Sequence, residues 1–318
     1  MNHLIIVNPA AGKEKAAQKA VPYLQQFFQD RHVLYETRFT QYPGHAAEIV
    51  RQTDLSQPTR IYACGGDGTL NEVLRAAYLF PQAQVAHIPC GSGNDFLRNF
   101  GTQEEFLDFE DLFEGESIPI DLIETSDHQI SASICSIGLD AKVAYQIPMF
   151  RRLPLCGGSA AYELSIVKCL LEPLGTRLSI TIDGQTIEGK FLLACIANGQ
   201  FYGGGYQGAP VARLDDGILE LITIHPVSRL KIASLLSQYK HGQHFSGQEV
   251  APEYTRFISH YRGKQIHIQA NRPFIVNRDG ECYPTQEISF SVLPKAAQIV
   301  LPKTVYERYC GSSAVMVP

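Results

Sequence analysis

A glycine-rich turn near residue 66 is the part of this chain whose residue types could do chemistry. The run Cys64–Thr69, CGGDGT, lies between a strand-like segment, residues 61–63, and a helical pattern, residues 70–79. Glycines let a polyanion approach the backbone, and the free N–H groups at a helix start favour negative charge. The turn and the start of the helix also carry polar side chains that a purely structural turn does not require: Asp67, Thr69, Asn71 and Glu72. We interpret the run as a phosphate-binding turn.

Two further turns of this kind follow strand-like segments in the first third of the chain. Asn8, Pro9 and Gly12 come after residues 4–7, and the turn 91–95 comes after residues 85–88. Alternating strands and helices predict a mostly parallel sheet, which binds ligands at the carboxyl ends of its strands. We therefore expect the three turns to converge and to hold a nucleoside triphosphate. Thr40, after a strand-like segment at residues 32–38, could add a hydroxyl, although an ordinary loop threonine explains it at least as well.

Several familiar nucleotide-binding motifs are absent from the sequence. There is no GxxxxGK[ST] P-loop, no GxGxxG opening the first helix, and neither the HRD nor the DFG motif of protein kinases. Any phosphoryl transfer would therefore depend on backbone amides and on a metal that the nucleotide carries.

Length and pattern predict two domains, because 318 residues suffice for two cores. Strands and helices alternate up to about residue 120, whereas the later strand-like runs are separated by turns with hairpin signals, Asp183-Gly184 and Asn198-Gly199. Helices are expected in that half at residues 160–171 and 227–240. The predicted architecture is a three-layer α/β domain with a mostly parallel sheet, followed by an antiparallel β-sandwich domain. Their predicted bounds are residues 1–120, completed by 297–318, and residues 121–296.

Charge and hydropathy exclude several classes of protein. The net charge is −5 and the pI about 6.1, with no basic block, so no nucleic-acid partner is expected. The chain begins directly with a strand-like run, and no apolar stretch is long enough to span a bilayer. We expect a cytoplasmic protein that meets a membrane only peripherally.

Two acidic turns lie in the second half of the chain. Asp215 and Asp216 are adjacent in a turn and could hold a hard cation, although a solvated hairpin turn explains them equally well. Asp279 and Glu281 flank Gly280 after a strand-like run, and a carboxylate fixed by such a turn could accept a proton from a hydroxyl. From these residues alone, a plain hairpin is the safer interpretation of the second turn.

Taken in order along the chain, these residues resemble the diacylglycerol kinase catalytic family, specifically its soluble bacterial lipid kinases. The GGDGT run alone is shared with NAD kinases, but its continuation, residues 70–73, and the turn at residues 89–96 are more specific. The segment from Asn198-Gly199 to Gly217 is also similar to that family. The resemblance covers nearly the whole chain, from Asn8 to Glu281.

The resemblance implies a set of functional residues. It implies Asp279 as the general base for a lipid hydroxyl, and a cleft between the two domains as the active site. It implies a structural magnesium held by Asp216, with Asp215 and backbone carbonyls around Arg213 and Ile218. ATP and its Mg²⁺ would be bound by Asn8, Thr40, Gly66, Asp67, Gly68, Thr69, Leu70, Asn71, Glu72, Ser92 and Glu281.

The expected function is ATP-dependent phosphorylation of a lipid hydroxyl, with diacylglycerol as the acceptor and phosphatidic acid as the product. Two alternatives stay open, an enzyme of NAD-kinase type with a soluble acceptor and a nucleotide-binding regulator without catalysis. The expected partners are a lipid substrate at the membrane surface and, in a homodimer, a second copy of the chain. We expect peripheral association with the inner face of the membrane, with Arg151-Arg152 and residues 160–171 as candidates for docking.

Overall fold

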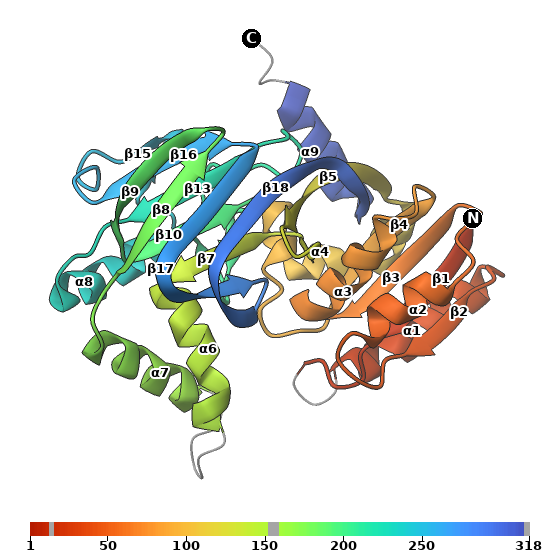
Figure 1. The fold of residues 1–318 in the computed structure, drawn as a ribbon. Helices are drawn as coiled ribbons and strands as arrows, with labels where there is room; N and C mark the ends of the chain where they lie inside the picture. Colours follow the sequence, from red (N-terminus) through yellow and green to blue (C-terminus); the bar gives the residue numbers. More distant parts are fainter. Residues whose placement is uncertain (13–15, 152–158, 315–318) are drawn as a thin grey trace. The chain divides into compact units, whose positions relative to one another are not determined.

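A computed structural model describes residues 1–12, 16–151 and 159–314 (Figure 1). The chain divides into two compact units. Unit 1 comprises Met1–Leu122, Gly203–Gly205 and Pro294–Pro318, and unit 2 comprises Ile123–Tyr202 and Tyr206–Leu293. Of the two arginines considered for docking, Arg152 lies outside the described residues.

Unit 1 is built around a parallel sheet with the strand order β2-β1-β3-β4-β18. The register places Ile61 of β3 on one side of Val85 and Ile299 of β18 on the other. The elements of this unit are β1 (Asn2–Val7), α1 (Ala16–Asp30), β2 (Glu36–Phe39), α2 (His45–Gln52), β3 (Thr59–Gly65), α3 (Asp67–Ala77), β4 (Ala83–Pro89), a short 3-10 helix (Phe96–Asn99), α4 (Gln103–Leu107), α5 (Phe109–Glu114), most of β5 (Glu116–Thr125), the end of β18 (Glu281–Leu301) and α9 (Lys303–Ala314).

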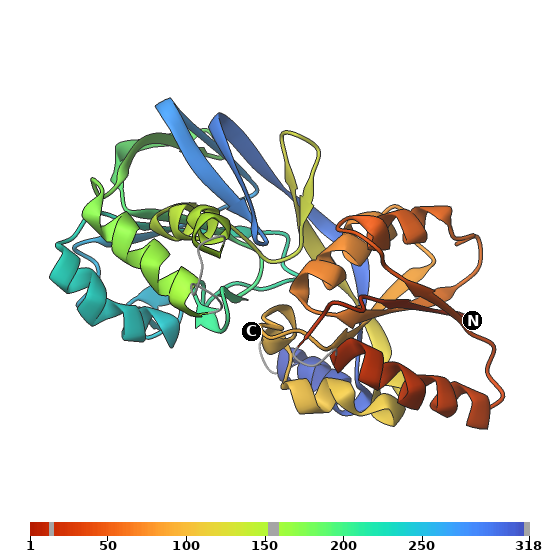
Figure 2. The same cartoon turned by 90° about the horizontal axis from the view of Figure 1, so that it is seen from below.

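Helices cover both faces of this sheet, as Figure 2 shows. All seven residues of β3 are buried, as expected for a parallel strand with helices on each side. On one face Leu24 and Phe28 of α1 pack against the sheet together with Leu112 of α5, and α2 packs beside α3. The sequence indicated a kink or a break in α1 at Pro22, but α1 continues through this residue, which is exposed. The predicted three-layer α/β unit is confirmed.

Unit 2 is antiparallel, with the strand order β16-β13-β10-β7-β17 and with β18 and β8 also paired to β17. Its elements are β6 (Ile130–Ser131), β7 (Ile134–Gly138), α6 (Leu139–Arg151), α7 (Ser159–Leu171), β8 (Thr176–Ile182), β9 (Gln185–Phe191), β10 (Leu193–Ala197), β11 (Phe201–Tyr202), β12 (Tyr206–Gln207), β13 (Leu219–Ile224), α8 (Arg229–Lys240), β14 (Phe245–Ser246), β15 (Glu249–Val250), β16 (Ile258–Gly263), β17 (Gln265–Arg278) and the first part of β18.

The strands of unit 2 bury alternate residues on two faces. Ile137 and Ile196 belong to one apolar cluster, whereas Ile134, Cys195 and Ile222 belong to another. Because successive side chains of a strand point to opposite faces, two separate buried clusters mean that these strands are covered on both sides. The predicted antiparallel β-sandwich is therefore confirmed.

In unit 2 one helix was missed and one local prediction was wrong. Helix α6 directly follows β7 and was not expected from the sequence. Asn198-Gly199 is not a hairpin, because β10 pairs with β7 and β13, and the N–H groups of both residues donate to the Ser133 carbonyl at 2.8 and 3.1 Å. Asp183-Gly184 does connect β8 to β9, with positive φ values of 44° and 89°.

Candidate functional site

The glycine turn of unit 1 joins the buried strand β3 to helix α3. Gly66 is the N-cap of α3 in an extended conformation, φ −98° and ψ −171°, and no side chain caps the helix start. The first N–H groups of a helix have no partner within the helix and favour an anion. Gly68, in the first turn, is exposed and has no heavy atom within 4 Å of where a Cβ would lie. This helix start therefore offers both donors and room to a phosphate.

The three predicted turns meet at the carboxyl ends of β1, β3 and β4. A Cβ on Gly91 would lie 2.5 Å from the Cα of Gly66, so two of the turns touch backbone to backbone. A Cβ on Gly12, at φ 79°, would collide with the carbonyl oxygen of Cys90. The Asn8 side chain, which follows β1, donates to Thr69 Oγ1 at 3.1 Å. These contacts bring the turns together within unit 1, as the sequence predicted for a nucleotide site.

Carboxylates and an amide hold the turn after β4 in place. Asp67 Oδ1 accepts the Phe96 N–H at 3.1 Å, and Asn94, at φ 49°, exchanges two hydrogen bonds with Gly91. Asp95 accepts the N–H groups of Gly204 and Gly205 at 2.7 and 2.6 Å. The pKa of Asp95 is raised above its ordinary value, because burial raises it and hydrogen bonds from these two N–H groups offset only part of that rise.

The contact of Asp95 with Gly204 and Gly205 was missed from the sequence. More than a hundred residues separate the aspartate from the glycines, and no local pattern pairs them. The run of three glycines at 203–205 was the available signal, because all three take positive φ values and let the backbone approach closely.

The other residues predicted to bind ATP occupy different environments. Glu72 accepts the N–H groups of Gly44 and Ala46, at 2.7 and 3.1 Å, and so caps α2. Leu70 lies in the core, Asn71 is 7% exposed, and Ser92 is exposed. The Thr40 N–H donates to the Val7 carbonyl at 2.8 Å, which places this threonine at the end of β1. Binding of ATP by Thr40, Leu70, Asn71, Glu72 and Ser92 stays a prediction.

The predicted base of unit 2, Asp279, lies in the hairpin between β17 and β18 with φ 44°. Its two carboxylate oxygens accept the N–H groups of Ala132 and Ile134 at 2.8 and 3.2 Å. Glu281 forms an ion pair with the largely buried Arg278 at 3.0 Å. The hairpin therefore presents a carboxylate in a fixed orientation, which a general base requires. The catalytic role of Asp279 and the role of Glu281 at the nucleotide stay predictions.

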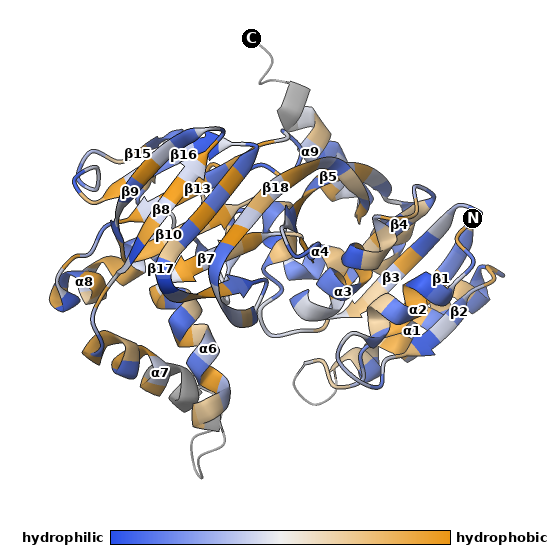
Figure 3. Ribbon diagram, viewed as in Figure 1, coloured by the Kyte–Doolittle hydropathy of each residue, from blue (hydrophilic) through white to orange (hydrophobic). Residues whose placement is uncertain are grey.

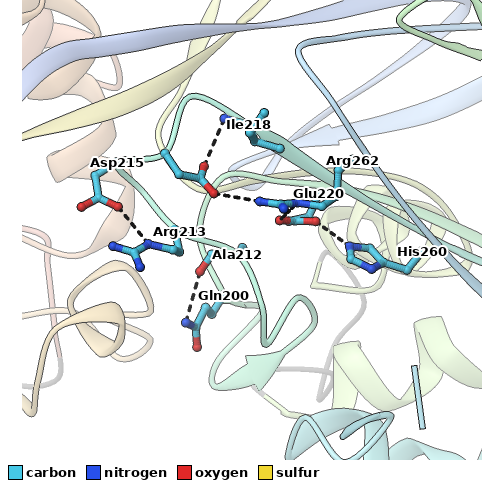
Figure 4. A network of polar contacts seen from close by, with 9 residues as sticks. Gln200, Ala212, Arg213, Asp215, Ile218, Glu220, His260 and Arg262 are labelled. Carbon is cyan, nitrogen blue, oxygen red and sulfur yellow. Dashed lines mark hydrogen bonds and ion pairs between the residues drawn. The ribbon is translucent and has the colours of Figure 1, made fainter. Parts of the chain in front are cut away.

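The acidic turn of Asp215 and Asp216 lies just before β13, and arginines pair with both aspartates (Figure 4). Asp215 pairs with Arg213 at 3.2 Å, and Asp216 accepts the Ile218 N–H at 3.1 Å. Arg262 of β16 binds Asp216 at 3.1 Å and the buried Glu220 at 3.0 Å. His260 also contacts Glu220 (Figure 4). In the described part of the chain, no three His, Cys, Asp or Glu side chains are grouped to hold a metal ion.

Two family models match this chain. Residues 2–125 match the family model of the diacylglycerol kinase catalytic domain. Residues 133–301 match the model of the YegS C-terminal NAD kinase beta sandwich-like domain.

Relatives with similar sequences are named as lipid kinases or diacylglycerol kinases. A protein of Shewanella frigidimarina named "Probable lipid kinase YegS-like" is 31% identical over 250 residues, 76% of each chain. A diacylglycerol kinase of Bacillus subtilis is 27% identical over 307 residues, 96% of this chain and 97% of the relative. A crystal structure titled as a putative diacylglycerol kinase of Bacillus anthracis shares the fold, with a TM-score of 0.70, 23% identity and coverage of 96% and 97%. The chain belongs to the diacylglycerol kinase-like family of lipid kinases.

Proposed function

We propose that the protein is an ATP-dependent lipid kinase whose acceptor is the hydroxyl of diacylglycerol and whose product is phosphatidic acid. One observation carries the proposal most: the Gly66 and Gly91 turns meet backbone to backbone at the uncapped start of α3. Such a start binds phosphate through N–H groups alone, and this suits a chain without a P-loop lysine. Membership of the lipid kinase family supports a lipid rather than a soluble acceptor.

The proposed reaction assigns separate tasks to the two units. In unit 1 the turn 65–69 binds the γ-phosphate, with Asn8 holding Thr69 in place. In unit 2 Asp279 accepts the proton of the acceptor hydroxyl while the hydroxyl oxygen bonds to the γ-phosphorus. The bond between that phosphorus and the β–γ bridging oxygen breaks, and ADP leaves. The N–H groups of Ala132 and Ile134 fix the orientation of the base.

Magnesium is proposed at two places. Mg²⁺ bound with ATP would neutralise charge on the transferred phosphoryl group, and Asp67, in the first turn of α3, is the proposed protein residue beside it. For a structural Mg²⁺ the proposed ligands are Asp216 and Asp215, with the carbonyls of Arg213 and Ile218. These oxygens suit a hard cation, but such an ion would compete with Arg262 for Asp216.

We also propose a cytoplasmic location with peripheral association at the inner face of the membrane, because the proposed acceptor is a membrane lipid. No described helix is both long and apolar enough to span a membrane. Surface binding would therefore bring this enzyme to its substrate.

The decisive experiment is transfer of labelled phosphate from ATP to a panel of acceptors in mixed micelles. We expect labelled phosphatidic acid from diacylglycerol, and little label in sphingosine or NAD. Transfer to NAD without lipid would identify an enzyme of NAD-kinase type instead. ATP binding without transfer to any acceptor would indicate a regulator.

Replacement of Gly68 by alanine tests whether phosphate occupies the space above the turn. The added Cβ meets no protein atom within 4 Å, so we expect unchanged stability or a gain of about 0.5 kcal/mol. ATP affinity should nevertheless fall about tenfold or more, or about 1.4 kcal/mol, because the methyl group occupies the ligand's space. Denaturant unfolding and titration calorimetry measure the two effects. Unchanged ATP affinity would exclude close approach of phosphate to Gly68.

Replacement of Arg262 by glutamine tests the structural magnesium site. Removal of the guanidinium takes a competing cation away from Asp216, so Mg²⁺ should bind more tightly there. We expect added Mg²⁺ to raise the Tm of the variant more than that of the unmodified protein, because a ligand of the folded state stabilises it by mass action. Arg256→Gln, at an exposed arginine of the same unit, is the control. Equal shifts in all three proteins would argue against Asp216 as a magnesium ligand.

A further inference from the structure

Two cysteines lie side by side beneath the glycine turns of unit 1. Cys64 is the next-to-last residue of β3, and Cys90 directly follows β4. Both thiols are free, and their Sγ atoms are 3.6 Å apart. The sulfurs of a disulfide are about 2.05 Å apart, so each of these sulfurs would have to move by only about 0.8 Å to form a bond.

The backbone holds the two thiols next to each other. In the parallel pair β3–β4, Cys64 lies opposite Ile88 and Gly65 lies opposite Pro89. The Gly65 carbonyl also accepts the Cys90 N–H at 2.8 Å, which carries the strand pairing one residue beyond the end of β4. Neighbouring strands are about 4.8 Å apart. The contact between the two sulfurs is therefore a fixed feature of the sheet.

The two thiols differ in how easily an oxidant reaches them. Both belong to the apolar cluster between the sheet and α1, together with Val7 and Ile88 (Figure 3). Cys64 is 0% exposed, whereas Cys90 is 6% exposed. The hydrogen bond from Cys64 holds the pKa of Cys90 below its ordinary value, although burial acts in the opposite direction. Because the thiolate is the reactive form, Cys90 is the thiol that a small oxidant would attack first.

Each cysteine adjoins a turn of the ATP site proposed above. Cys64 precedes the Gly66 turn and Cys90 precedes Gly91, and a Cβ on Gly91 would lie 2.5 Å from the Cα of Gly66. A Cβ on Gly12 would collide with the carbonyl oxygen of Cys90, so the third turn also touches this residue. Closely packed interiors transmit strain. A bond that pulls Cys64 and Cys90 together would therefore displace the turns.

We propose that Cys64 and Cys90 are a redox pair: oxidation joins them in a reversible disulfide, and this disulfide weakens ATP binding. Disulfides of cytoplasmic proteins are usually transient and act in catalysis or redox sensing. The effect on ATP rests on the proposed kinase function, whereas formation of the bond does not. If the two thiols only fill space in the core, no bond forms.

Hydrogen peroxide is a sufficient oxidant for this step. The Cys90 thiolate attacks one peroxide oxygen, the O–O bond breaks, and Cys90 becomes a sulfenic acid while hydroxide leaves. The Cys64 thiol then loses its proton and attacks the Cys90 sulfur, so that the S–S bond forms and the S–O bond breaks. In total two thiols and one peroxide give one disulfide and two water molecules. Two electrons pass from the sulfurs to the peroxide oxygens.

Peptide mapping tests whether the bond forms. The protein is treated with limiting hydrogen peroxide, the remaining thiols are alkylated, and the digest is examined by mass spectrometry. We expect a peptide pair linked through Cys64 and Cys90 that disappears after reduction with dithiothreitol. Absence of this pair at a peroxide dose that oxidises the exposed Cys310 would overturn the proposal.

Titration calorimetry tests whether the bond changes ATP binding. We expect the oxidised protein to bind ATP about tenfold less tightly than the reduced protein, within the usual range of coupling between sites, and dithiothreitol to restore the affinity. In Cys90→Ala the oxidised and reduced forms should bind equally, and Cys90→Ser, nearly equal to cysteine in size, repeats the test if the alanine variant is unstable. Cys310→Ala is the control and should respond like the unmodified protein. Each variant is compared with its own reduced form, so the effect of the substitution itself cancels.

Two results of this titration would overturn the effect on ATP. One is unchanged affinity in the linked protein. The other is an equal loss of affinity in oxidised Cys90→Ala, because another oxidised group would then be responsible.

The coupling must also act in the reverse direction. In a redox buffer of dithiothreitol, saturating ATP should raise about tenfold the ratio of oxidised to reduced reagent at which half of the protein is linked. An unchanged ratio would overturn the coupling. Absence of ATP binding by the reduced protein would refute the proposed function, whereas the linked peptide alone decides whether the redox pair exists.

Discussion

Replacement of Asp279 by asparagine should slow phosphoryl transfer about 100- to 10,000-fold, the usual effect of removing a general base. An amide cannot take the proton of the acceptor hydroxyl. ATP affinity should be nearly unchanged, because the turns that bind it in our proposal belong to unit 1. Initial rates with saturating diacylglycerol and titration calorimetry with ATP measure the two effects.

Asp183→Asn is a closely matched control for this experiment. Asp183 also lies in an Asp-Gly hairpin turn with φ 44°, and its carboxylate accepts the N–H groups of Lys264 and Gln265. Both substitutions turn an amide N–H toward backbone donors, so both should destabilise unit 2 by about 1–3 kcal/mol. Only Asp279→Asn should slow turnover to the extent given above. If both variants keep wild-type rates, the carboxylate of Asp279 has a purely structural role.

Replacement of Gly91 by alanine should damage unit 1 and its ATP site together. The new Cβ would lie 2.5 Å from the Cα of Gly66 and 2.8 Å from Asn94 Oδ1, so the two turns must separate. We expect the free energy of unfolding to fall by about 1–3 kcal/mol, as for other overpacked sites. ATP binding should fall below detection, because the N–H groups of the two turns would no longer face one ligand. Denaturant unfolding and ATP titration measure these effects.

Gly311→Ala is the control for that substitution. Gly311 lies within α9 and has no atom within 4 Å of its Cβ position, so alanine should be neutral or slightly stabilising there. A Gly91→Ala protein with normal ATP affinity would show that contact between the turns is not needed for binding.

The sequence predicted the elements whose signals are local. The strands β1, β3 and β4 are mostly apolar and are followed by turns that contain glycine, so both the strands and the three turns could be located. Helix α6 could not be predicted in this way, since it contains Pro148 and packs against α7 and β17. Asn198-Gly199 misled for the same reason, because the partners of β10 come from distant parts of the chain.

In the candidate site, too, features with a local sequence signal could be predicted, and contacts between distant residues could not. Gly66 and Gly91 were recognisable as turn glycines, but only the structure shows that they touch. Glu72 lies within the recognised motif, and its bonds to the start of α2 depend on a segment some 26 residues earlier. Asp279 and Asp183 are each followed by glycine in a hairpin turn, and both have a φ of 44°. Residue type and geometry therefore do not separate a base from a structural aspartate, and the paired variants are needed.

The end of β18 has a consequence for how the protein is made. Ile299 and Val300 complete the unit 1 sheet beside β4, and Thr304 of α9 binds Asp111 of α5. These residues are synthesised after all of unit 2, so the β4 edge stays unpaired until unit 2 has been made, while unit 2 needs no residue beyond Leu293. The second half of the chain can therefore finish folding before the first. A nascent chain that stops before Pro294 would expose an open strand edge and would be prone to aggregate.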